Sequence, residues 1–112
     1  MQIPEASEVV KSYKKIKYFI HHTPVLNSTD LNEKIGTKIW LKCENFQKVG
    51  AFKFRGACNA VLPLEASVAK NGVATHSSGN HGQAIAKAAQ IKGIPAYIVM
   101  PKNAPKVKIP EL

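Results

Sequence analysis

Apolar residues recur at steps of three and four positions near the start of the chain, and lysines fill the positions between them. This spacing predicts an amphipathic helix over residues 5–19. Its apolar face would consist of Val9, Val10, Tyr13, Ile16 and Phe19 or Ile20. Pro24 ends the pattern, because the residue before a proline is pushed out of the helical region, and residues 24–26 are expected to be extended.

Two further elements are expected before residue 50. Ser28 or Thr29 can cap a short second helix, and Gly36 lies where a helix C-cap is expected. Residues 38–42 alternate polar and apolar side chains, which is typical of a strand. Residues 45–50 are expected to form a loop.

The rest of the chain alternates helices and strands. We expect helices at residues 52–62 and 82–92, strands at residues 72–76 and 96–100, and a turn at residues 77–82. A strand–turn–helix–strand unit is typical of a parallel α/β sheet. A sheet with so few strands would have unpaired edges and uncovered faces. The predicted fold class is therefore α/β with an incomplete open parallel sheet.

Composition narrows the class of protein. The chain has 112 residues, of which 45% are hydrophobic, so it is one small domain at most. A net charge of +9 can signal nucleic acid, an acidic membrane surface or anionic ligands. The lysines are scattered, Arg55 is the single arginine, and no zinc-finger, leucine-zipper or RNA-binding signature is present. We therefore expect no nucleic-acid partner.

Cysteine use and apolar runs indicate a cytoplasmic setting. Cys43 and Cys58 make no disulfide framework. No signal-peptide pattern is present, and the apolar runs are too short to span a bilayer, so no membrane partner is expected. His21 and His22 are adjacent and cannot share a helix face, and no metal ligands are predicted.

The turn at residues 77–82 is the first candidate for chemistry. It follows a strand and opens a helix, so backbone N–H groups and the positive end of the helix dipole would face an anion. Short polar side chains lie around this point: Ser77, Ser78, Asn80 and His81. They suit a carboxylate or phosphate. The alternative is an ordinary turn in which a serine caps the helix.

Lys53 is the second candidate, since it lies between Phe52 and Phe54. A lysine between two aromatic rings can be desolvated, which lowers its pKa and makes the amine a nucleophile for a carbonyl. The alternative is a solvated helix lysine with one ring packed beneath it.

Together the two segments carry a resemblance. Residues 48–57 (KVGAFKFRGA) and 77–84 (SSGNHGQA) resemble, in order and separation, the leading motifs of fold-type II pyridoxal-phosphate (PLP) enzymes. Within these, the chain is most similar to the serine racemase / threonine dehydratase family. Residues 23–26 and 93–99 extend the likeness, which covers nearly all of the chain up to about Pro105.

The resemblance implies roles for individual residues. Lys53 matches the lysine that forms the Schiff base with PLP and serves as the base on one face of the substrate carbon. Phe52 matches the residue packed beside the cofactor ring, and Asn80 the asparagine that binds the phenolic oxygen. The substrate carboxylate would be held by Ser77, Asn80 and His81, which agrees with the anion site expected above.

Ser78 helps to distinguish a racemase from a dehydratase. A racemase must exchange a proton on both faces of one carbon, so it needs a second acid/base group opposite Lys53. The family's serine racemases have a serine here, whereas typical threonine dehydratases have alanine. Ser78 therefore favours racemisation, although some dehydratases of hydroxyamino acids also carry this serine.

The resemblance also implies an effector site. Mammalian-type serine racemases bind ATP and Mg, and the matching nucleotide positions are Ser28, Thr29, Lys48 and Gln83. The alternatives are a helix cap, a surface lysine and a helix glutamine. The metal site of the family lies later in its chains, and family members are typically homodimers.

The chain departs from the family in two ways. Ala51 and Val49 replace family residues that carry hydroxyls, which would weaken hydrogen bonding near the cofactor without removing the Schiff base. Family members are also much longer, so we expect a truncated catalytic unit. Its residues 1–52 would begin the large domain and residues 53–112 the small domain.

The expected activity follows from this likeness. The parent enzyme would interconvert L- and D-serine and eliminate water from serine or threonine, giving a 2-oxo acid and ammonia. A serine/threonine dehydratase is one alternative. A non-catalytic product, or a module that docks on a full-length subunit, is another. The isolated chain is expected to hold PLP weakly and to turn over negligibly.

Overall fold

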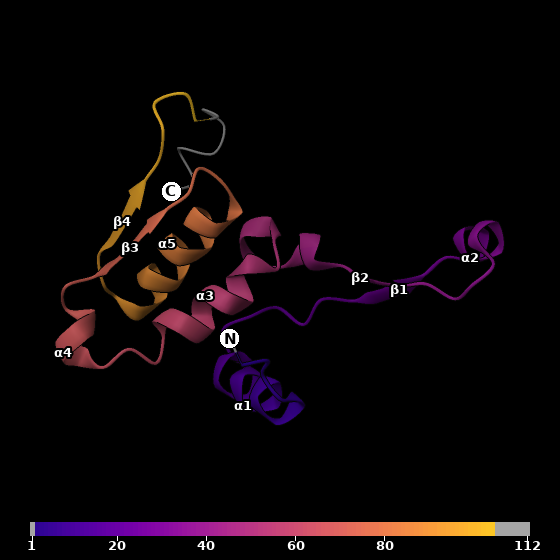
Figure 1. Cartoon of the computed structure of the whole chain (residues 1–112), viewed down its shortest axis with the longest axis horizontal. Coiled ribbons are helices and arrows are strands. Elements are labelled where there is room, and N and C mark those ends of the chain that lie inside the picture. Colours follow the sequence, from indigo (N-terminus) through magenta and orange to yellow (C-terminus); the bar gives the residue numbers. More distant parts are fainter. Residues whose placement is uncertain (1, 105–112) are drawn as a thin grey trace.

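The computed structural model describes residues 2–104 and shows a helical body from which a thin arm extends (Figure 1). The α-helices are α1 (Ala6–Ile16), α2 (Thr29–Ile35), α3 (Lys53–Val61), α4 (Ala66–Ala69) and α5 (Asn80–Lys92). The strands are β1 (Val25–Asn27), β2 (Trp40–Lys42), β3 (Val73–His76) and β4 (Ala96–Val99), and two short 3₁₀ helices are η1 (Glu44–Phe46) and η2 (Lys48–Gly50).

The strands form two separate pairs. β3 and β4 are parallel, with Val73 opposite Ala96 and His76 opposite Val99, and α5 connects them. This unit confirms the α/β fold class with a small parallel sheet. β1 and β2 are instead antiparallel, with Val25 opposite Lys42, so the segment predicted as a strand at residues 38–42 lies outside the parallel sheet.

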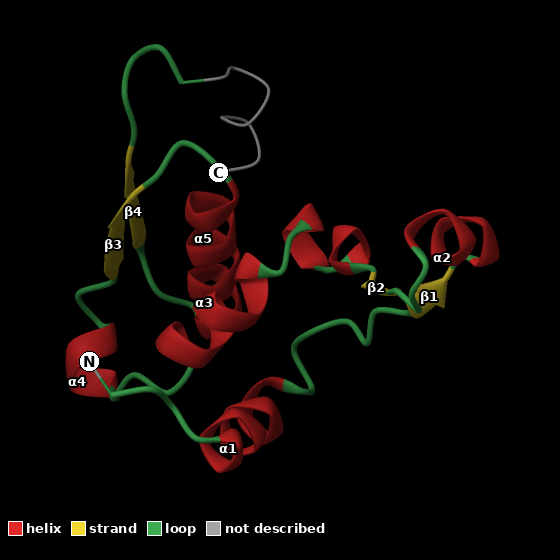
Figure 2. Ribbon diagram, turned by 45° about the vertical axis from the view of Figure 1, so that its right-hand side comes forward, coloured by secondary structure: helices red, strands yellow, loops and turns green. Residues whose placement is uncertain are grey.

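The core lies between α3 and α5, which run side by side in both views (Figure 2). Phe54 and Cys58 of α3 are fully buried. They face Ala84 and Ala88 of α5, whose small side chains are also fully buried and allow the two helices to approach closely. This packing brings the two motif-bearing segments together.

Helix α1 is shorter than predicted and most of its apolar face is uncovered. It ends at Ile16, and within the expected face only Ile16 and Ile20 are buried in the core. Val9 and Val10 are 61% and 52% exposed. Of α1 itself, only Ile16 joins the buried core cluster, and periodicity predicts an apolar stripe without predicting what covers it.

The arm consists of β1, α2 and β2 and is held by side-chain amides. Asn27 Nδ2 donates to the carbonyl of Ile39 (2.7 Å), and Asn32 Oδ1 accepts from the N–H of Ile39 (2.8 Å). Ser28 caps α2, and Gly36 ends it in the left-handed conformation, as predicted. The arm projects away from the α3–α5 core in both views.

Three local predictions differ from the structure. Residues 45–50 are not a plain loop, since η1 and η2 occupy residues 44–50. Helix α5 begins at Asn80 and not at residue 82, so Asn80 and His81 belong to its first turn. Helix α4 was not predicted, because one turn of four residues is too short to show a period. Within residues 2–104, none of the helices has the length and apolar character needed to cross a membrane.

Candidate functional site

Lys53 is the first residue of α3, and its side chain is exposed. Its ammonium nitrogen lies 5.4 Å from the centroid of the Phe52 ring. Of the two interpretations of Lys53, its contacts fit the solvated helix lysine with one ring beside it, because Phe54 is fully buried in the core. Consecutive side chains on a helix point in different directions, so only one of the flanking rings stays with the amine.

A cavity of about 380 Å³ lies beside Lys53, between α3 and α5. Its lining residues are Phe52, Lys53, Gly56, Ala57, Ala60, His81 and Ile85. Lys53 and His81 come from different motifs, so the packing of α3 on α5 places the two candidate segments at one cavity. The small residues of α3 leave room beside the amine.

The start of α5 is tightly organised by Ser77. Its Oγ accepts hydrogen bonds from the backbone N–H groups of Gly79 (3.2 Å) and Gly82 (3.1 Å). A Cβ at Gly82 would lie 3.1 Å from Cγ2 of Ile98 and from the carbonyl oxygen of Ser77, so a side chain there would crowd the sheet. Ser77 therefore holds the helix start from two residues before its N-cap, Gly79, while Ser78 is half-buried and Asn80 and His81 are exposed.

Arg55, two positions after Lys53, forms an ion pair with Glu44. Arg55 donates to Glu44 through Nε and through Nη2, the latter at 3.1 Å, and Thr23 Oγ1 donates to the same carboxylate at 2.6 Å. The Arg55 hydrogen bond, with help from Thr23, lowers the pKa of Glu44 from its usual 4.5 to about 2. The pKa of Arg55 is raised by the same bond. Sequence reasoning missed this pair, whose one visible signal was the single arginine.

Two more side chains clamp the segment before α3. Gln47 is buried, and its amide donates to the carbonyl of His21 (2.9 Å) and accepts from the N–H of His21 (2.9 Å). Lys48 Nζ donates to the carbonyl of Phe19. These bonds join residues 19–23 to residues 44–48, and periodicity could not reveal them.

The backbone between this clamp and α3 is strained. Val49 has φ 58° and Gly50 has φ 65°. The left-handed region suits glycine, but a β-branched residue such as valine is rarely found there. Such conformations persist only where surrounding contacts hold them.

The four positions matched to the nucleotide effector do not meet in one chain. Ser28 and Thr29 lie at the start of α2 on the far end of the arm, whereas Gln83 lies on α5 in the body (Figure 1). Ser28 accepts from the N–H of Leu31 (3.3 Å), and Lys48 is bonded to Phe19.

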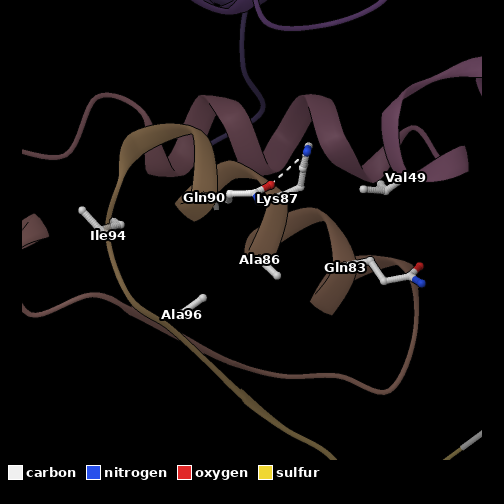
Figure 3. Close-up of a pocket in the computed structure, with 7 residues that line it drawn as sticks. All are labelled: Val49, Gln83, Ala86, Lys87, Gln90, Ile94 and Ala96. Atoms are coloured by element: carbon white, nitrogen blue, oxygen red, sulfur yellow. Dashed lines mark hydrogen bonds between the residues drawn. The ribbon is translucent and has the colours of Figure 1, made fainter. Parts of the chain in front are cut away.

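A second cavity lies against α5. It measures about 420 Å³ and is lined by Val49, Gln83, Ala86, Lys87, Gln90, Ile94 and Ala96 (Figure 3). Gln90 accepts a hydrogen bond from Lys87 across its rim (2.9 Å). Lys53 is not among its lining residues, so this cavity is distinct from the one at the two motifs. No group of three or more potential metal ligands occurs among the described residues 2–104.

Comparison with known proteins gives a consistent result. The model of the family described as pyridoxal-phosphate dependent enzyme matches residues 16–112. The chain is 58% identical to serine racemase of Arabidopsis thaliana over 90% of its own length and 30% of that protein. It is 49% identical to L-threo-3-hydroxyaspartate ammonia-lyase of Saccharomyces cerevisiae over 97% of its length and 33% of that protein.

A solved structure agrees with these relatives. Maize serine racemase superposes with a TM-score of 0.93 at 44% identity, covering 98% of this chain and 33% of the maize chain. The chain thus spans about a third of the length of the relatives it matches.

Proposed function

Because the chain belongs to the family of pyridoxal-phosphate dependent enzymes, we propose that it serves a serine racemase-like reaction on a hydroxyamino acid. The reaction interconverts L- and D-serine and also eliminates water from serine or threonine, giving a 2-oxo acid and ammonia. The observation that carries this proposal is that Lys53 and His81 line one cavity. The reaction needs the amine that carries the cofactor and the turn that binds the substrate carboxylate to lie at the same cavity.

The residues present fit the carbonyl end and the ring of PLP. The amine of Lys53 is exposed at the cavity, and the Phe52 ring lies beside it. Asn80 stands in the first turn of the neighbouring helix, where it would bind the phenolic oxygen. When bound, PLP withdraws electrons from the α-carbon of an amino acid and so makes its proton acidic.

The chain's own groups would then move the proton. Lys53 Nζ would take it from one face of the α-carbon, and Ser78 Oγ would supply or take it on the other. Ser77, Asn80 and His81 would hold the substrate carboxylate at the start of α5, where the helix dipole favours an anion. Racemisation requires a proton-transfer group on each face of the α-carbon, whereas elimination requires only one.

A dehydratase, or ammonia-lyase, is the second candidate. The 49% identity to the yeast ammonia-lyase favours it, because elimination needs the same lysine and the same substrate turn. The two candidates differ in what Ser78 does, since loss of water from the β-carbon does not require protonation from the second face.

Covalent labelling tests the cofactor assignment. The chain is incubated with PLP, reduced with borohydride and digested, and the labelled lysines are mapped by mass spectrometry. We expect preferential label on Lys53 and loss of visible cofactor absorbance in Lys53→Ala. Lys70 is an exposed lysine directly after α4 and does not line the cavity at Lys53, so Lys70→Ala should leave both unchanged. Label spread evenly over the lysines would refute the assignment.

A chimera tests the reaction. Residues 1–104 replace the matching third of maize serine racemase, and D-serine and pyruvate are measured from L-serine. Production of D-serine that disappears in Lys53→Ala supports racemisation. Pyruvate without D-serine identifies the lyase. For the chain by itself we expect weak PLP retention and negligible turnover.

ATP and Mg remain proposed effectors of the complete enzyme. Since Ser28 and Thr29 lie far from Gln83 within one chain, a common nucleotide site would need a second subunit, which accords with a homodimer. We also propose the division at residues 52 and 53 into two domains, and a cytoplasmic location that suits the free thiols of Cys43 and Cys58.

A further inference from the structure

We propose that Glu44 is a positioning residue for Lys53, and that its carboxylate, by binding Arg55 and Thr23, sets where α3 begins and where the Lys53 amine lies. The inference rests on the proposed function, in which Lys53 carries the cofactor. Glu44 itself does not line the cavity at Lys53.

The first argument is the geometry of the pair. Arg55 follows Lys53 by two positions, and both lie in the first turn of α3. Two guanidinium nitrogens of Arg55 donate to the two oxygens of Glu44. A bidentate pair of this kind fixes the orientation of both partners and not only their separation. The side chains of Arg55 and Glu44 are only 27% and 15% exposed, so water screens the pair weakly.

The second argument is that α3 lacks the usual means of fixing a helix start. Its N-cap, Phe52, has helical dihedral angles and offers no side-chain hydrogen bond. Its first turn contains no acidic residue, yet it holds two cations, Lys53 and Arg55. Cations at a helix N-terminus are opposed by the helix dipole. Glu44 supplies from outside the helix the negative charge that its first turn lacks.

The third argument is the chain path. The pair joins residues separated by eleven positions and so closes a loop whose middle contains the strained Val49. Strain of this kind relaxes unless both ends of the segment are held. Gln47 holds the segment on the side of His21, and the Glu44–Arg55 bond holds it on the side of α3. Thr23 ties the same carboxylate to a third segment.

The carboxylate is suited to a constant role. Its pKa of about 2 keeps it ionised throughout the range in which the protein would work. A positioning group that never changes its charge holds Lys53 in one place while the amine changes its own bonding.

The test compares Glu44→Gln, which keeps the shape and removes the charge, with Glu33→Gln on the exposed surface of α2. Amide hydrogen exchange is followed in peptides covering residues 48–56 and 83–92, without cofactor. We expect Glu44→Gln to speed exchange roughly tenfold at residues 48–56, because a hydrogen bond to a charged group changes a local opening equilibrium by about that factor. Exchange at residues 83–92 should stay unchanged, as should both peptides in Glu33→Gln.

A second readout is the share of borohydride-fixed PLP label on Lys53. It should fall in Glu44→Gln and not in Glu33→Gln. If wild type labels Lys53 and Glu44→Gln labels it equally, the positioning role is overturned while the proposed function stands. If wild type shows no preference for Lys53, the proposed function fails, and the exchange data alone decide whether Glu44 sets the start of α3.

Two variants of Thr23 keep the inference testable if Glu44→Gln does not fold. Thr23→Ser keeps the hydroxyl that donates to Glu44, whereas Thr23→Val removes it at nearly the same volume. The inference requires faster exchange at residues 48–56 in Thr23→Val and not in Thr23→Ser. Equal exchange in the two variants would overturn it.

Discussion

Gly72 lies so close to Pro95 that a Cβ on Gly72 would be 2.6 Å from the carbonyl oxygen of Pro95. The same carbonyl accepts the N–H of Val73 at 2.9 Å, so this approach begins the pairing of β3 with β4. Gly72 also has φ +81°, a conformation that L side chains rarely adopt. Two independent constraints therefore require glycine at this position.

We expect Gly72→Ala to destabilise the protein by about 2–4 kcal/mol, since backbone strain adds to a steric clash that involves backbone and not a flexible side chain. Gly93→Ala is the matched control. Gly93 has φ +75° but open space around its Cβ position, so it should cost only about 1 kcal/mol. Denaturant unfolding measures both, and equal losses would contradict the steric role of Pro95.

Acid should weaken the protein through Glu44. Its pKa is lowered from 4.5 to about 2 in the folded protein, so the stabilisation is complete above pH 4.5 and is lost as the pH falls toward 2. In that window the unfolded chain takes up a proton that the folded chain does not. The loss amounts to roughly 3 kcal/mol at most. Urea unfolding at a series of pH values should show this slope in wild type and a flatter one in Glu44→Gln.

The two thiols should differ in reactivity. Burial raises the pKa of Cys58 to about 11, and its side chain is fully buried, so it stays a protonated and shielded thiol at neutral pH. Cys43 is only half-buried. An alkylating reagent should therefore modify Cys43 in the native protein and both thiols after denaturation. Rapid native labelling of Cys58 would show that the α3–α5 core opens readily.

Substitution of Ser77 should lower stability, whereas substitution of Ser78 should change the reaction. Ser77 accepts two backbone N–H groups at the start of α5, so Ser77→Ala should cost about 1–2 kcal/mol. Ser78→Ala should leave thermal stability nearly unchanged. In the chimera with maize serine racemase it should reduce D-serine formation far more than pyruvate formation. Equal loss of both products would remove Ser78 from the racemisation step.

Much of the local structure could be predicted from the sequence. The α3 and α5 helices, the cap at Ser28 and the end at Gly36 follow from periodicity and from short-range backbone chemistry. The start of α5 was placed two residues late. Glycine and polar residues at positions 79–81 suggest a turn, whereas Asn80 and His81 belong to the first turn of α5, where Ser77 Oγ accepts from the N–H of Gly82.

The sequence by itself determined that residues 48–57 and 77–84 carry the motifs of a PLP enzyme, because such motifs are contiguous and local. Only the tertiary structure decided that Lys53 shares a cavity with His81, that one flanking ring and not two stays beside its amine, and that Arg55 binds Glu44. These contacts join segments far apart in the chain. Their geometry depends on how α3 packs against α5 and against the segment before it, which no local pattern encodes.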